Sequence, residues 1–144
     1  RAGLRPLQLF YWAKTNPPPN PRKNFQSAVE VAVFARKPGK IIHWDGGGAT
    51  RNIYQTPISM GSERTAHPTQ KNLDLMRFLV RLLCPKGGRV LDPFGGSGTT
   101  VVAAMLEKRV GVMIERDSEY VEIATQRLAE WERSDQNRQL DLLG

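Results

Sequence analysis

A glycine-rich turn at residues 93–98 constrains the fold of this 144-residue chain more than any other feature. The short apolar segment Arg89–Asp92 precedes the turn, and the alanine- and valine-rich segment Thr99–Lys108 follows it. A second apolar segment, Gly111–Glu115, comes next. A strand, a helix and a strand with short connections form a right-handed crossover within a parallel sheet. The sequence therefore predicts an α/β fold with a mostly parallel sheet.

Two further helices are expected around this unit. Apolar residues at helical spacing predict a helix over residues 73–83, which Pro85 ends. A second helix is expected from Glu119 to about Arg133, with Ser118 as its N-cap. The polar tail, residues 134–144, is expected to fray.

The first half of the chain is less regular. Aromatic and β-branched residues predict strands at 7–12 and 29–35, separated by a proline-rich extended loop. Residues 36–66 show no sustained period, so we expect an irregular segment with a short strand at 40–43.

The glycine turn has the parts of a nucleotide pocket. Glycines let a ligand approach the main chain closely, and a helix N-terminus follows them. Glu115, at the end of the next strand, can accept both hydrogen bonds of a ribose diol. A P-loop is excluded because Thr99 follows Gly98 where that motif needs lysine. The dinucleotide fingerprint is weakened because Val101 stands where it needs glycine or alanine.

Asp92 narrows the range of candidate ligands further. A carboxylate directly before the glycines would repel a pyrophosphate, but it suits a ligand that carries an amino group and a sulfonium. We expect Asp92 and Glu115 to face one pocket. The alternative interpretation is that the turn is only a tight strand-to-helix connection.

Charge indicates a polyanionic partner. The chain holds 21 basic and 14 acidic residues, a net charge of +7. The excess lies in the first hundred residues, whereas residues 101–144 hold six basic and nine acidic side chains. A basic surface is thus expected on the first two thirds, with the acidic last helix facing away from any phosphate backbone.

Cys84 is the only cysteine, so an intrachain disulfide is excluded and a reducing, intracellular setting is the default. Within an apolar run it is interpreted as a small buried hydrophobe rather than a catalytic thiol. No apolar stretch reaches the roughly 20 residues of a membrane span. His43 has no partner cluster, so no metal site is expected. Because the chain begins with Arg1, we expect a fragment or a gene remnant.

Three blocks of the sequence resemble the β-group amino-methyltransferases of DNA, which make N6-methyladenine or N4-methylcytosine. Residues 92–100 (Asp-Pro-Phe-Gly-Gly-Ser-Gly-Thr-Thr) are similar to that family's cofactor loop. Residues 67–71 (His-Pro-Thr-Gln-Lys) resemble the block before it, and residues 111–120 resemble the strand whose acidic end binds ribose. Their order is that of the β-group, and weaker similarity covers residues 12–17 and 24–30.

The resemblance implies a Rossmann-like fold truncated at its N-terminal side, with S-adenosylmethionine as the cofactor. It implies late strands of a catalytic subdomain at 1–35, target recognition at 36–66 and a cofactor region at 67–133. Asn72 replaces the family's usual proline, which should loosen the start of the following helix. The implied cofactor-binding residues are Asp92, Pro93, Phe94, Gly95, Gly96, Ser97, Gly98, Glu115, His67, Thr69 and Lys71.

The family's catalytic tetrapeptide, an Asp, Asn or Ser followed by two prolines and an aromatic, is expected upstream of Arg1. Asn16, Pro17 and Pro18 imitate it, but Pro19 cannot stack on a base, so we interpret them as a decoy. Basic residues near aromatic ones are candidates for contacting double-stranded DNA. They are Arg22, Lys23, Lys37, Lys40 and Arg51.

The resemblance thus implies a bacterial or phage DNA methyltransferase of a restriction-modification system. Two alternatives stay open. The chain could be a non-catalytic remnant or a subunit that supplies cofactor and DNA surface to a partner chain or dimer. It could instead methylate a small molecule, which predicts no salt-dependent affinity for DNA.

Overall fold

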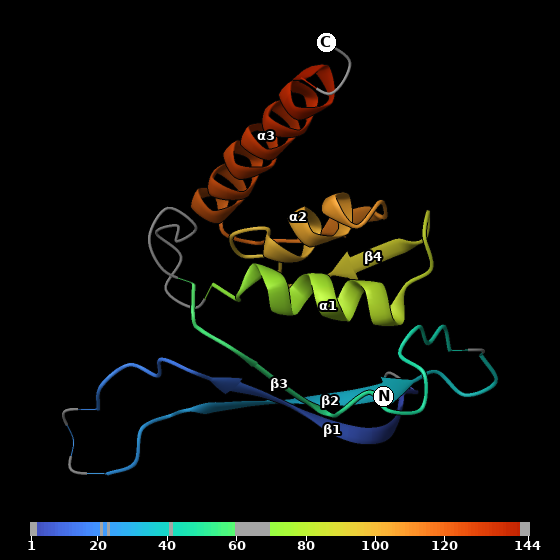
Figure 1. The fold of residues 1–144 in the computed structure, drawn as a ribbon, viewed down its shortest axis with the longest axis vertical. Helices are drawn as coiled ribbons and strands as arrows, with labels where there is room; N and C mark the ends of the chain where they lie inside the picture. The colour runs from blue at the N-terminus through green and yellow to red at the C-terminus, as the bar shows by residue number, and fades with distance from the viewer. Residues whose placement is uncertain (1–2, 21, 23, 41, 60–69, 142–144) are drawn as a thin grey trace. The chain divides into compact units, whose positions relative to one another are not determined.

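A computed structural model of the chain describes residues 3–20, 22, 24–40, 42–59 and 70–141 (Figure 1). It divides into two compact units, Arg1–Ile58 and Ser59–Gly144, which are described separately. The elements in chain order are β1 (Arg5–Lys14), β2 (Val29–Arg36), β3 (Ile53–Thr56), α1 (Leu73–Leu83), β4 (Arg89–Asp92), α2 (Thr99–Leu106), β5 (Val110–Met113) and α3 (Ser118–Asp141).

The first unit is a three-stranded sheet in the order β2-β1-β3. β1 and β2 are antiparallel, whereas β1 and β3 are parallel. Trp12 of β1 is buried, and its indole N–H donates to the carbonyl of Thr56 over 3.2 Å. The expected strands at 7–12 and 29–35 are therefore confirmed, and both extend beyond those bounds.

The expectation for residues 36–66 was wrong in one respect. Lys40, Ile42 and His43 do not lie in a strand, and Ile41 lies outside the described residues. The strand of this region is β3, whose four residues pair with β1 from Tyr11 to Lys14. Ile53, Tyr54 and Thr56 favour a strand, but a run of four residues is too short to identify one, and the pairing depends on an edge offered by a strand about forty residues earlier.

The second unit contains the predicted strand-helix-strand crossover. β4 and β5 pair in parallel, from Arg89 opposite Val110 to Asp92 opposite Met113. α2 connects them and lies beside α1 (Figure 1). Two of the three strand pairings described are thus parallel, as expected for a mostly parallel sheet. The core is formed by Leu73, Val80, Val102 and Ala103, with Met76, Val90, Leu106, Leu128 and Trp131 packed against it.

α1 occupies the predicted residues, but its start differs from expectation. Asn72 is buried, and its side-chain oxygen accepts a hydrogen bond from the Leu75 amide over 3.0 Å. A side-chain cap of this kind stabilises a helix by about 1 kcal/mol. The expectation that Asn72 loosens the helix start was wrong, because the cap replaces what a proline ring would provide.

α3 also differs from the sequence prediction at both ends. The Asp117 side chain accepts from the Glu119 amide over 3.0 Å, so Asp117 caps the helix and Ser118 is its first residue. The helix continues to Asp141 instead of fraying after Ser134. No glycine or proline occurs between these residues, and each added residue gains one backbone hydrogen bond.

Cys84 is a buried free thiol, as predicted. Its carbonyl accepts two hydrogen bonds from the buried Arg109 guanidinium, which fixes the chain where α1 ends. Within the described ranges, no helix has the length and apolar character needed to cross a membrane.

Candidate functional site

The turn between β4 and α2 needs glycine at two points. Gly98 has a φ of 74°, and its amide donates to the Gly95 carbonyl over 2.9 Å at the start of α2. A Cβ on Gly95 would lie 2.4 Å from Met113 Cε and 2.8 Å from Met113 Cβ. A side chain would be strained at position 98 and would collide with Met113 at position 95. The turn therefore lies directly against β5.

Asp92 stabilises the turn from its start. One carboxylate oxygen accepts from the Phe94 amide over 3.1 Å. The other accepts from the Thr100 hydroxyl over 2.5 Å. The carboxylate therefore connects the end of β4 to the first turn of α2.

Glu115 holds the turn from the neighbouring strand. Its Oε2 accepts from the Gly96 amide over 2.8 Å, and its Oε1 accepts from the amides of Arg116 and Asp117 over 2.7 and 3.0 Å. The bond from Gly96 connects residues nineteen positions apart in the chain. The two acids predicted from the sequence therefore both contact the same turn.

The expectation that both acids face one pocket was wrong. Asp92 lines a cavity of about 130 Å³ together with Gln70, Lys71, Phe94 and Thr100. Glu115 lines a second cavity of about 410 Å³, whose other walls come from β5 and α3 and include Val121, Ala124 and Leu128. Gly96 lines the first cavity and donates to Glu115 of the second, so the turn is the boundary between them.

Arg127 of α3 is a residue of this site that the sequence did not reveal. Its buried guanidinium donates to the Ser97 carbonyl over 3.2 Å and to the Thr99 hydroxyl over 2.8 Å. It thereby fixes the far side of the turn to α3. An arginine within a long polar helix carries no local signal for such a role, because its partners lie 28–30 residues earlier.

The structure describes some of the remaining predicted cofactor residues and not others. Phe94 is 87% exposed at the rim of the smaller cavity, which Lys71 also lines. His67 and Thr69 lie outside the described residues, as does Lys23 among the DNA candidates. Four of the candidate DNA-binding side chains are described in the first unit, and all four are exposed, namely Arg22, Lys37, Lys40 and Arg51. Among the residues described, no cluster of three or more His, Cys, Asp or Glu could hold a metal ion.

Asn16 has a structural role in the first unit. Its side-chain oxygen accepts a hydrogen bond from the Ile58 amide over 2.8 Å, which ties the end of β1 to the chain after β3. Such a contact explains an asparagine at this position without any catalysis. It therefore favours the interpretation of Asn16, Pro17 and Pro18 as a decoy.

A parallel strand-helix-strand unit with an acid-flanked glycine turn defines a Rossmann-like nucleotide-binding domain. Comparisons with known proteins agree with this class. A family model described as DNA methylase matches residues 1–126. The chain belongs to this DNA methylase family.

Individual relatives and solved structures are consistent with the family. The type II methyltransferase M2.MboI of Moraxella bovis is 35% identical over 136 residues, covering 86% of this chain and 50% of that protein. The crystal structure of an M1.HpyAVI–SAM complex has a TM-score of 0.76 at 32% identity, covering 88% and 63%. PvuII DNA methyltransferase, cytosine-N4-specific, has a TM-score of 0.70 at 25% identity, covering 82% and 49%. The chain thus spans about half the length of the curated relative.

Proposed function

We propose that this chain supplies the S-adenosylmethionine site of a methyltransferase that acts on the exocyclic amino group of adenine (N6) or cytosine (N4) in DNA. Membership of the DNA methylase family supports the proposal. The observation that carries it is the glycine turn, which carboxylates from the ends of β4 and β5 stabilise on either side.

The two cavities fit the two ends of this cofactor. The larger one, about 410 Å³, has apolar walls and the Glu115 carboxylate, which suits an adenine ring and a ribose diol. The smaller one has the Asp92 carboxylate and Lys71 at its walls, which suits an amino acid end with both charges. We infer that the cofactor lies across the turn at Gly95–Ser97, with the ribose at Glu115 and the methionine part beside Asp92 and Lys71. When bound, S-adenosylmethionine supplies the electrophilic methyl group.

We propose that the chain's own residues position the cofactor for the reaction. Direct methyl transfer needs aligned reactants, and a loop fixed by several hydrogen bonds loses little further freedom when a ligand binds. Asp92, Glu115 and Arg127 fix the turn by bonds to its backbone and hydroxyl groups. We propose that His67 and Thr69 complete the methionine end.

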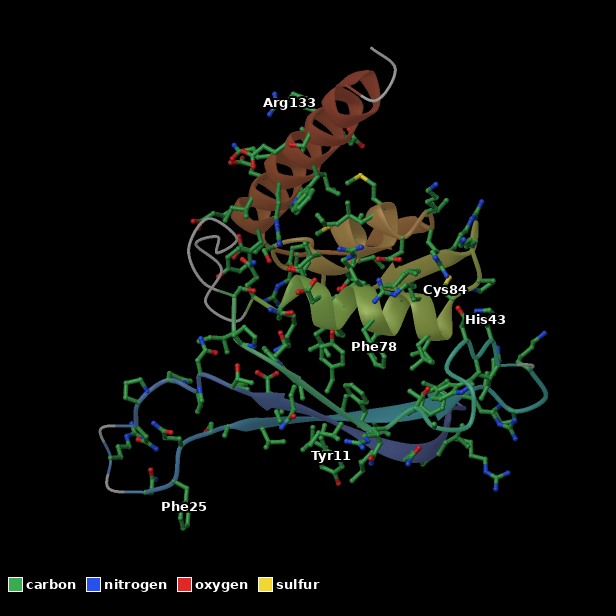
Figure 2. All side chains as sticks on the ribbon, viewed as in Figure 1. Tyr11, Phe25, His43, Phe78, Cys84 and Arg133 are labelled. Carbon is green, nitrogen blue, oxygen red and sulfur yellow. The ribbon has the colours of Figure 1, made fainter. Side chains whose placement is uncertain are left out.

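The DNA surface is proposed on the first unit. Asn20 organises the loop between β1 and β2, since its side chain accepts from the Arg22 amide and donates to the Phe25 carbonyl. Phe25 is 97% exposed at this loop and projects away from the ribbon (Figure 2). An exposed aromatic ring three residues after Arg22 in the sequence suits an unstacked base and its phosphate. We add Phe25 to the candidates Arg22, Lys23, Lys37, Lys40 and Arg51, and we propose that residues 36–66 recognise the target.

We further propose that the catalytic tetrapeptide comes from the half of a methylase that the chain does not span. The Asn16 contact with Ile58 supports this proposal. We also propose that the protein is cytoplasmic and belongs to a bacterial or phage restriction-modification system. Relatives such as the type II methyltransferase M2.MboI of Moraxella bovis support this proposal.

Calorimetric titration tests the cofactor site. We expect the folded chain to bind S-adenosylmethionine and its demethylated product, and not to bind ATP, because Asp92 lies where a phosphate chain would be repelled. Absence of binding to a folded sample would contradict the proposal.

A gel-retardation assay tests the DNA surface against the alternative of a small-molecule methyltransferase. We expect the chain's affinity for duplex DNA to fall as salt rises, because phosphate contacts release counterions. An affinity that is absent, or independent of salt, would favour the small-molecule alternative.

A further inference from the structure

Both sheets have one open apolar face. In the second unit, side chains alternate along β4 and β5, and one set lies exposed while the other faces α2. Gly111 belongs to the covered set, since a Cβ there would lie 2.7 Å from Val101 of α2. The aliphatic residues of the exposed set are 45–61% accessible and are Leu91, Val110 and Val112, with Arg89 exposed at the start of β4.

The sheet of the first unit repeats this pattern. Strand register places Leu9 beside Val33, Tyr11 beside Val31 and Ile53, and Ala13 beside Val29. These residues lie on one face, opposite the face that contains buried Trp12. The large aliphatic side chains of the open face are 44–63% accessible, and they are Leu9, Val29, Val31, Val33 and Ile53.

Such faces are unusual for a protein surface. Single exposed aliphatic residues are common, but aliphatic residues that fill one face of each of two sheets mark a contact surface. A parallel pair such as β4–β5 normally has both faces covered by helices. Here α2 covers one face, and the opposite one carries no helix from the described residues.

The length of the relatives indicates which partner could cover these faces. The chain covers 50% of M2.MboI and 63% and 49% of the two solved methylases, so between about a third and a half of each of them remains unmatched. We propose that the open faces of β1–β2–β3 and β4–β5 bind apolar helices from the complementary half of a DNA methylase. This inference rests on the proposed function, and it adds the surface and the partner that complete it.

Co-expression tests the interface. The full 144-residue chain is produced with a tag, together with the untagged half of M2.MboI that it does not match. We expect the two to purify as a one-to-one complex. Leu9→Asp and Val112→Asp should each lower recovery of the partner by about tenfold or more, because they bury an unpaired carboxylate.

Gln8→Asp is the matched control. Gln8 is also exposed on β1 but points to the opposite face, so this variant should retain the partner. Urea unfolding of the isolated chain should give Leu9→Asp and Gln8→Asp the same midpoint. A much lower midpoint for Leu9→Asp would mean that the chain itself already covers this face, and it would overturn the proposal.

Three other outcomes overturn it as well. They are a partner half that stays separate or insoluble, equal loss of the partner in all three variants, and self-association of the chain through the same residues. S-adenosylmethionine binding is measured on the same isolated chain. Cofactor binding without partner binding refutes this inference alone, whereas absence of cofactor binding refutes the proposed function.

Discussion

Glu115→Gln separates the two roles that the structure gives to this residue. The wild-type carboxylate accepts three backbone amides, one on Oε2 and two on Oε1. A glutamine has a single acceptor oxygen, and its NH₂ group must face at least one of those amides. The glutamine orientation that loses the fewest hydrogen bonds keeps the side-chain oxygen toward the amides of Arg116 and Asp117 and turns the NH₂ group toward Gly96.

The expected cost follows from one lost charge-assisted hydrogen bond. Such bonds contribute about 1.5–3 kcal/mol, and the partial exposure of Glu115 reduces this figure to about 1–2 kcal/mol of unfolding free energy. The variant also loses a charged acceptor for the proposed ribose hydroxyls. We expect S-adenosylmethionine affinity to fall by about tenfold or more, which corresponds to about 1.4 kcal/mol.

Urea unfolding and calorimetry, both at 25 °C, measure the two effects. Glu122→Gln is the control, because Glu122 is an exposed acid on α3 that lines neither cavity. An unchanged unfolding free energy would contradict the hydrogen bonds around the turn. A destabilised variant that retains cofactor affinity within about twofold would show that Glu115 only stabilises the turn, and the ribose assignment would fail.

Three further substitutions test other parts of the structure. Gly111→Ala should lower the unfolding free energy by about 1–3 kcal/mol, because its Cβ meets α2 at 2.7 Å, whereas Gly48→Ala, with open space around it, should change it little. Asn72→Ala should cost about 1–2 kcal/mol in the same urea assay, and Asn72→Asp should restore most of it by retaining the cap. Phe25→Ala should weaken duplex DNA binding in gel retardation by about 1–3 kcal/mol, with the exposed neighbour Gln26→Ala as control; equal effects of the two would refute stacking by Phe25.

The amino-acid sequence by itself determined the elements with strong local signals. The crossover from β4 through α2 to β5 was predictable because strand composition, glycines and helix formers follow one another within about 25 residues. α1 was predictable from its apolar period and from Pro85. The position of the two acids at the glycine turn was predictable, since the ends of parallel strands meet at one edge of a sheet.

The tertiary structure decided what depends on partners distant in the chain. β3 forms on an edge of β1, and Arg127 reaches the turn from α3. Asp92 and Glu115 line separate cavities because each carboxylate is oriented by amides and hydroxyls of the turn itself. Local sequence specifies which backbone conformations a segment prefers, but side-chain direction and cavity walls are set by neighbours that only the folded chain brings together.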